Sequence, residues 1–190
     1  FFFLVFCQQL LVVNGYVFAN KAELLTAVAG WIADETAATT TYGIINNWDV
    51  SAVSDMSELF KDKSTFNSDI SGWDVSGATT MNGMFKSASV FNQDISGWDV
   101  SGVTSMAYIF NFASAFNQDI SGWNVGNVTN MNSMFRSASV FNQDISGWDV
   151  SGVTNMYEMF GSASIFNSDI SGWNVGAVTN MRYMFYSASV

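Results

Sequence analysis

Residues 91–115 read FNQDISGWDVSGVTSMAYIFNFASA, and this 25-residue unit decides the organisation of the chain. Close copies begin, without insertion or deletion, at Phe66, Phe116, Phe141 and Phe166. A degraded copy precedes them, with Trp48 in the same register. A fixed period of this kind is typical of arrays in which each unit buries its apolar face against its neighbours. The sequence therefore predicts six repeats over residues 41–190, and we expect the array to continue beyond them.

Each repeat combines two periodicities. In the unit quoted above, Trp98 and Val100 alternate with polar residues, which is the period of a strand. After a turn at Gly102, apolar residues recur at the spacing of one face of a short helix. These residues are Val103, Met106, Phe110 and Ala113. The pattern predicts an α/β repeat solenoid of leucine-rich-repeat-like, right-handed coils, each a short parallel strand plus a short helix, with an N-terminal capping helix.

The aromatic side chains of the repeats form three columns. An aromatic ladder can serve as a ligand platform, but here every copy carries the same rings at inward-facing positions, so a stacked core is the better interpretation. The columns are Trp48, Trp73, Trp98, Trp123, Trp148 and Trp173; Phe60, Phe85, Phe110, Phe135, Phe160 and Phe185; and Phe66, Phe91, Phe116, Phe141 and Phe166.

Two segments precede the repeats. Residues 1–19 are mostly apolar and end with the small residue Ala19, which predicts the remnant of a secretory signal peptide. The alternative is a buried helix or strand that packs on the first coil. Residues 20–40 predict a helix that begins at Asn20, with Glu23 placed to reach back to the helix start. This helix is expected to cap the first coil, and a partner-binding helix is the alternative.

The composition excludes several classes of function. The chain has 16 acidic and 6 basic residues, a net charge of −10, which argues against nucleic-acid binding. It has no His, so a Ser-His or Cys-His nucleophile pair is impossible. Its carboxylates recur in every copy, whereas a catalytic pair should be unique. We therefore expect a protein that is not an enzyme and has no cofactor, and whose mature chain has no membrane span.

Two columns of acidic residues raise the question of calcium. Stacked carboxylates repel one another, so either hydrogen bonds from loop amides and Ser hydroxyls or bound calcium must offset the repulsion. The candidate metal ligands are Asp69, Asp94, Asp119, Asp144 and Asp169. A second column, made of Asp49, Asp74, Asp99 and Asp149, is interrupted by Asn124 and Asn174.

The positions at which the copies differ supply a candidate binding surface. They fall on the outer face of the predicted short helix, where the simplest explanation is solvent exposure without constraint. The alternative is a binding strip, because Tyr and Arg are typical interface anchors. The residues of this tyrosine–arginine strip are Tyr108, Arg136, Tyr157, Arg182, Tyr183 and Tyr186.

The recurring string FNQDISGWDVSGVTNMxxMF resembles the BspA-type leucine-rich-repeat surface protein family, a 25-residue variant that is also a domain of unknown function in mycoplasma surface lipoproteins. The resemblance covers residues 41–190. It implies a secreted or surface-attached protein that takes part in adhesion, and it carries no catalytic residues. Here Trp, Met and Phe stand where leucine-rich repeats have Leu.

Together these observations predict a secreted or cell-surface scaffold that binds an extracellular protein or glycan. The alternative is a structural protein whose molecules associate end to end into a surface fibre or matrix. A calcium-dependent module is a third possibility. The two leading hypotheses differ in solution, because a binder stays monomeric whereas a fibre former grows with concentration.

Overall fold

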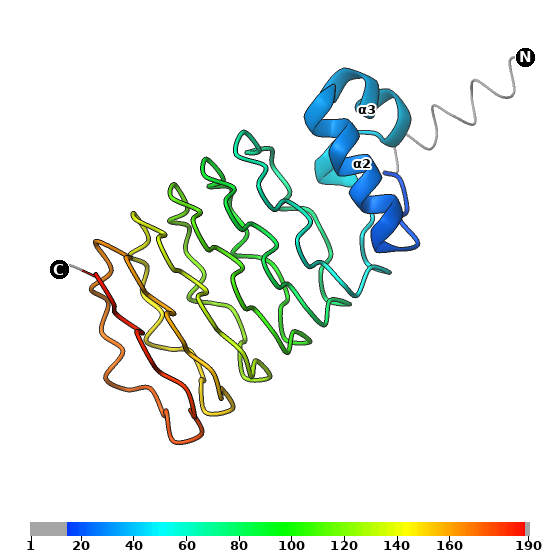
Figure 1. Cartoon of the computed structure of the whole chain (residues 1–190). Coiled ribbons are helices and arrows are strands. Elements are labelled where there is room, and N and C mark those ends of the chain that lie inside the picture. The colour runs from blue at the N-terminus through cyan, green and yellow to red at the C-terminus, as the bar shows by residue number, and fades with distance from the viewer. Residues whose placement is uncertain (1–14, 189–190) are drawn as a thin grey trace, which may run out of the picture.

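The structure is a computed structural model that describes residues 15–188. A small helical cap lies at the N-terminal end, and a row of stacked coils, one per 25-residue repeat, leads away from it (Figure 1). The cap consists of α2 (Lys21–Ala33), α3 (Glu35–Tyr42) and the 3-10 helix η1 (Ile45–Asn47). Consecutive coils are joined by single parallel bridges from Asp55 to Thr80 and onward to Asn180.

The helix predicted over residues 20–40 is present as two helices rather than one. Its start is as predicted: the Asn20 side chain accepts from the Glu23 N–H at 3.0 Å, and Glu23 Oε2 accepts from the Ala19 N–H at 3.1 Å. The chain turns at Asp34, whose backbone is extended with φ −156°. Asp34 Oδ1 accepts from the Ala37 N–H at 3.0 Å, so this residue starts α3. A short acidic side chain favours such a cap over a helix interior, which explains the break.

The α/β solenoid prediction is wrong, because the segment predicted as a helix in each coil is a run of overlapping β-turns. In one coil, the Ile109 N–H donates to Met106 O at 3.2 Å, and the Ala113 N–H donates to Phe110 O at 3.0 Å. Other N–H groups of the segment point to the next coil: those of Tyr108 and Phe110 donate to Asn132 O at 2.8 Å and to Met134 O at 3.0 Å. A helix would keep these bonds within the segment. The spacing of three and four fits consecutive turns as well as a helix, so periodicity misassigned it.

The predicted strand around Trp98 is also absent. The leucine-rich-repeat prediction, which requires that strand, is therefore wrong as well. Between residues 15 and 188 the only β-pairing is the set of isolated bridges. The Trp98 N–H donates to Ile95 O of its own coil at 3.2 Å, and the Ser101 N–H donates to Asp99 Oδ1 at 3.0 Å. A side chain that accepts a hydrogen bond from the N–H two residues later competes with the hydrogen bonds of a β-sheet. The apolar alternation therefore buries Trp98 and Val100 without forming a sheet.

The core is the predicted stack of rings. The ring centroid of Phe110 lies 5.7 Å from those of both Phe85 and Phe135 in the neighbouring coils. It lies 3.8 Å from that of Phe116, which follows shortly after it in the chain. The two Phe columns thus run side by side along the stack. Trp123 packs against Phe110 at 6.1 Å, and its Nε1–H donates to Ile95 O of the preceding coil at 3.1 Å. Each indole therefore fixes the register between coils as well as filling the core.

The chain before α2 packs on the first coil. Phe18 is fully buried 5.1 Å from Trp48, and its N–H donates to Asp49 O at 2.9 Å. Gly15 has φ +74°, and a Cβ there would meet Asn47 O at 1.7 Å, so no larger residue fits. The predicted signal peptide covers residues 1–19, most of which lie outside the described residues, and it stays a prediction. No helix in residues 15–188 is long and apolar enough to cross a membrane.

Candidate binding surface

The tyrosine–arginine strip follows the turn segments along one side of the stack. In each coil, these turns carry a Phe inward, and that Phe meets the Trp that comes from the opposite side, as Phe85 meets Trp98 at 6.2 Å. The residues directly beside the Phe, such as Ile109 and Asn111, are also buried, whereas Tyr108 and Tyr183 are 38% and 49% exposed. The strip is formed by positions of these turns that are at least partly exposed.

Two of these residues lie at a position whose backbone is left-handed in every coil. Tyr108 and Tyr183 have φ of 61° and 58°, because each is the third residue of a turn that demands a positive φ. Gly83 meets that demand without strain, with φ 60°. Glu58, Ser133 and Glu158 occupy the same position in the other coils, so the left-handed backbone belongs to the repeat and does not mark the tyrosines as functional.

Each coil has a second left-handed position, and in one coil Phe112 occupies it with φ 57°. It is 44% exposed, and the Arg136 guanidinium lies over its ring, 5.1 Å from the centroid. Arg136 Nε also pairs with Glu158 Oε2 at 2.6 Å. These contacts join three consecutive coils across the surface.

Tyr108 is held from both sides. The Lys86 ammonium lies 5.5 Å from the centroid of its ring, and Asn132 Nδ2 donates to its hydroxyl at 2.9 Å. Lys86 and Asn132 belong to the coils before and after. The ring is 38% exposed, so one face stays open to solvent while its position is fixed.

The remaining predicted residues gather at the C-terminal end of the strip. Tyr157 and Tyr183 meet edge to face at 5.9 Å, and Tyr183 meets Tyr186 at 5.7 Å. The Arg182 guanidinium lies 5.3 Å from the centre of the Tyr183 ring. A hydrogen bond to the Glu158 carboxylate raises the pKa of Tyr157. The structure therefore brings the six predicted residues onto one surface, as one cluster at Tyr108 and Arg136 and a second at Tyr157 to Tyr186.

Three residues of this surface were missed by the sequence prediction: Lys86, Phe112 and Glu158. The signal that could have found Phe112 is its departure from the repeat, because the equivalent residues are Ser87, Ser137 and others of the same type. Lys86 and Glu158 stand at variable positions too, but neither is Tyr or Arg, the residue types that selected the strip.

The aspartate columns are bonded to their own loops. Asp94 Oδ1 accepts from the Ser96 N–H at 2.9 Å, and the backbone N–H and hydroxyl of Ser96 hold the pKa of Asp94 below its ordinary value. The same bonds recur down the column. For Asp144, hydrogen bonds from Ser146 outweigh the repulsion of the neighbouring carboxylates, so its pKa is also lowered. Hydrogen bonds to the charged form therefore offset the stacking of like charges.

The structure offers no metal site in these columns. Within residues 15–188, no group of three or more His, Cys, Asp or Glu side chains is placed to hold an ion. The carboxylates Asp69, Asp94, Asp119, Asp144 and Asp169 are exposed, and each accepts from the N–H two residues ahead.

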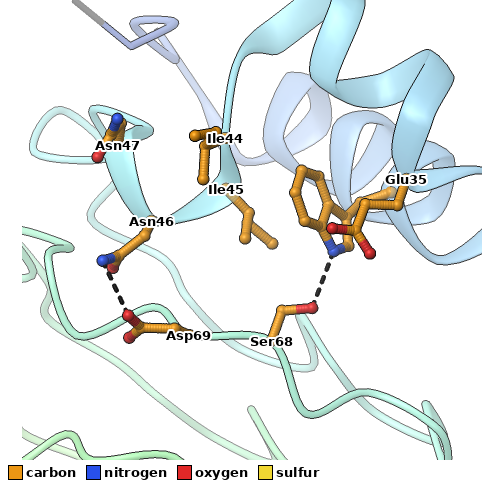
Figure 2. Close-up of a pocket in the computed structure, with 8 residues that line it drawn as sticks. Glu35, Ile44, Ile45, Asn46, Asn47, Ser68 and Asp69 are labelled. Carbon is orange, nitrogen blue, oxygen red and sulfur yellow. Dashed lines mark hydrogen bonds between the residues drawn. The ribbon is translucent and has the colours of Figure 1, made fainter.

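A cleft of about 500 Å³ lies where the cap meets the coils. Figure 2 shows Asn46 reaching to Asp69, and its Nδ2 donates to Asp69 Oδ2 at 3.0 Å. The Trp31 Nε1–H donates to the Ser68 hydroxyl at 3.0 Å. Asn46 Oδ1 further accepts from the Gly72 N–H at 2.7 Å. Because these polar groups satisfy one another, the cleft holds the cap to the coils and has few free groups for a ligand.

The fold and the surface define a class: a turn-built array of 25-residue coils with a helical cap and a strip of aromatic and charged side chains along one side. Residues 32–139 and 119–190 match the family described as Mycoplasma protein of unknown function, DUF285, and the chain belongs to that family. No curated protein and no solved structure matches the chain.

Proposed function

We propose that this protein is a secreted or cell-surface scaffold, without catalytic activity, that binds an extracellular protein or glycan through the tyrosine–arginine strip. The observation that carries the proposal is the Tyr108 ring, which Lys86 and Asn132 of the neighbouring coils hold in place while it stays 38% exposed. A ring that is fixed in position and open to solvent on one face can contact a partner at little cost in ordering. The resemblance to BspA-type surface proteins supports the same location and role.

The composition of the strip fits this role. Tyr183 and Tyr186 are 49% and 62% exposed, and Phe112 is 44% exposed. Tyr and Arg are over-represented among the residues that dominate binding energy, since they offer large area at little entropic cost. Their position on a rigid stack, held by bonds between coils, reduces the cost of ordering them on binding.

The alternative, end-to-end association into a fibre or matrix, rests on a different surface. Phe185 and Met181 are 49% and 40% exposed on the last described coil, whereas Phe160 and Met156 at the equivalent positions are fully buried. A following coil, whether a further repeat or part of another molecule, would bury these side chains as the coils before it do.

The test is binding to arrays of glycans and of extracellular-matrix proteins. The strip variant is Tyr108→Ser with Tyr157→Ser and Tyr183→Ser, because Ser133 already occupies the same column as Tyr108. The matched control removes three exposed apolar residues outside the strip: Val90→Ser, Val140→Ser and Ile165→Ser.

The expected result is a ligand that the chain and the control bind and that the strip variant loses by tenfold or more. Far-ultraviolet circular dichroism and melting of the variants check that all three remain folded. Equal loss in strip variant and control, or no binding to either array, contradicts the proposal.

A further inference from the structure

The third coil, residues 91–115, departs from the other copies in its outer turn. Phe112 stands where every other copy has Ser or Asp, and Tyr108 stands in the same turn. Their rings are 44% and 38% exposed. In the matching turns of the coils on either side, residues 81–87, 131–137 and 156–162, no large apolar side chain is exposed. The exposed pair of rings is therefore a feature of this coil and not of the repeat.

Groups of the neighbouring coils hold both rings. The Lys86 ammonium of the preceding coil lies 5.5 Å from the centroid of the Tyr108 ring. The Arg136 guanidinium of the following coil lies 5.1 Å from that of Phe112. The backbone is tied as well, because the Phe112 N–H donates to Arg136 O at 2.8 Å. With a cation on one side of each ring, the other side is presented to solvent in a fixed orientation.

The charges around the rings are answered within the same surface. Arg136 Nε pairs with Glu158 Oε2 at 2.6 Å, and the Lys86 ammonium lies over an aromatic ring. On the first coil, Lys61 pairs with Glu58 at 2.7 Å. Cations and carboxylates that pair with one another leave little net charge to attract a charged ligand, so the site suits an uncharged one.

Hydrogen-bonding groups lie at the edge of the Tyr108 ring. The Tyr108 hydroxyl accepts from Asn132 Nδ2 at 2.9 Å, which leaves its own O–H to donate. Asn132 Oδ1 accepts from the Ser133 hydroxyl at 2.8 Å, and the amide keeps a second N–H and a second lone pair. The Arg136 guanidinium likewise has N–H groups beyond the one that faces Glu158. Planar groups of this kind can bond two neighbouring hydroxyls at once.

We infer that the outer turn of the third coil binds a neutral glycan, whose pyranose units stack on the open faces of Tyr108 and Phe112. The inference rests on the proposed function, because it names the class of ligand that the same surface takes. The C–H groups on one face of a pyranose ring carry partial positive charge, and the face of an aromatic ring is negative. The hydroxyls of the sugar point sideways, where the Asn132 amide and the Arg136 guanidinium meet them.

The size of the apolar surface favours a glycan over a protein. A specific protein interface buries about 800 Å² on each partner around an apolar core. One aromatic side chain buries at most about 150–250 Å². The neighbouring coils place Ser87 and Ser137 beside Phe112, and Gly83 and Ser133 beside Tyr108. Two partly exposed rings among small residues fall short of a protein interface core but match the face of a sugar.

The test is affinity electrophoresis in gels that contain a neutral polysaccharide, β-glucan, galactan or mannan, with the acidic polysaccharides alginate and heparin for comparison. The ring variants are Phe112→Ser and Tyr108→Ser, because Ser137 and Ser133 already occupy these positions in the next coil. Tyr108→Phe keeps the ring and removes only the hydroxyl. The matched control, Val140→Ser, removes an exposed apolar side chain outside the strip. Circular dichroism checks that every variant is folded.

The expected result is retardation of the unaltered chain and of the control by at least one neutral polysaccharide. Each ring variant should weaken binding by about tenfold or more, while Tyr108→Phe retains most of it. Titration with an oligosaccharide of the retarding polymer should give the same affinity at low and high salt, because the ligand is uncharged.

Three results overturn the inference: retardation by acidic polysaccharides alone, ring variants that bind like the unaltered chain, and a loss with Tyr108→Phe as large as that with Tyr108→Ser. If no neutral polysaccharide retards the chain while the triple-tyrosine strip variant loses a matrix protein, the proposed function stands and only the glycan inference fails. If the chain binds neither class of ligand, both fail.

Discussion

Replacing Phe110 by Ala removes a ring that is held on every side. Phe110 is fully buried, with ring centroids of Phe85 and Phe135 both at 5.7 Å and that of Phe116 at 3.8 Å. A buried aromatic ring takes at least about 150 Å² out of water, worth about 4 kcal/mol at 25 cal/mol per Å². The cavity left between coils adds to that loss. Phe110→Ala should lower the free energy of unfolding by about 3–5 kcal/mol.

Phe185→Ala is the matched comparison, because it deletes the same ring from the same column. Phe185 is 49% exposed and keeps its neighbour Phe160 at 5.6 Å. Half the burial halves the transfer energy, so the loss should be about 1–2 kcal/mol. The difference between the two variants measures what the following coil contributes.

Amide hydrogen exchange under native conditions is the assay, because arrays of repeats unfold in parts and a single midpoint can mislead. Protection should fall at the N–H of Phe85, which donates to Ile109 O at 2.9 Å, in the Phe110 variant alone. Equal losses in the two variants would refute the reasoning that neighbouring coils supply the stability of each ring.

Four further outcomes follow from the structure. Gly83→Ala should lower the free energy of unfolding by about 1–2 kcal/mol, because the φ of Gly83 is +60°. An added Cβ would meet only side-chain atoms at 3.7 Å, so the cost comes from the backbone. Gly161→Ala, at a residue without a positive φ, should lower the melting temperature less. In a chain that retains residues 15–19, Phe18→Ala should cost about 3–5 kcal/mol and loosen the first coil, detected as faster amide exchange around Trp48. The aspartates with lowered pKa values stabilise the folded state when ionised, so urea midpoints should stay level from pH 5 to 8 and fall as the pH drops below about 4. Those residues are Asp55, Asp74, Asp94, Asp99, Asp119, Asp144, Asp149 and Asp169. Melting curves with calcium and with a chelator should coincide, because the described residues hold no group of carboxylates placed to bind an ion. A higher melting temperature with calcium would contradict this prediction.

The sequence predicts which residues are buried much better than it predicts the path of the backbone. The ring columns follow from identity at a fixed spacing, so residues such as Phe110 and Trp123 are placed correctly from the repeat alone. The turns are not predictable in this way, because the residues with positive φ include Tyr108 and Phe112 rather than Gly or Asn. Bonds to the next coil stabilise these conformations, and no local pattern reveals such bonds.

The candidate surface could be predicted from the positions at which the copies differ. The apolar residues that recur in every coil belong mainly to the core, and the positions that differ between copies include Tyr108 and Arg136 on the surface. Their contacts with Lys86 and Glu158 depend on how coils are staggered, which requires coordinates.

The identical bonding between coils also bears on how such a protein changes over generations. The Tyr108 N–H reaches a carbonyl in the next coil at 2.8 Å, and the Ser133 N–H one coil later does the same at 2.8 Å. An in-frame duplication of one unit inserts a coil that finds the same partners on both sides, and loss of a unit rejoins surfaces that already fit. Length can drift by recombination while folding is preserved, and each new copy brings outer positions free to diverge.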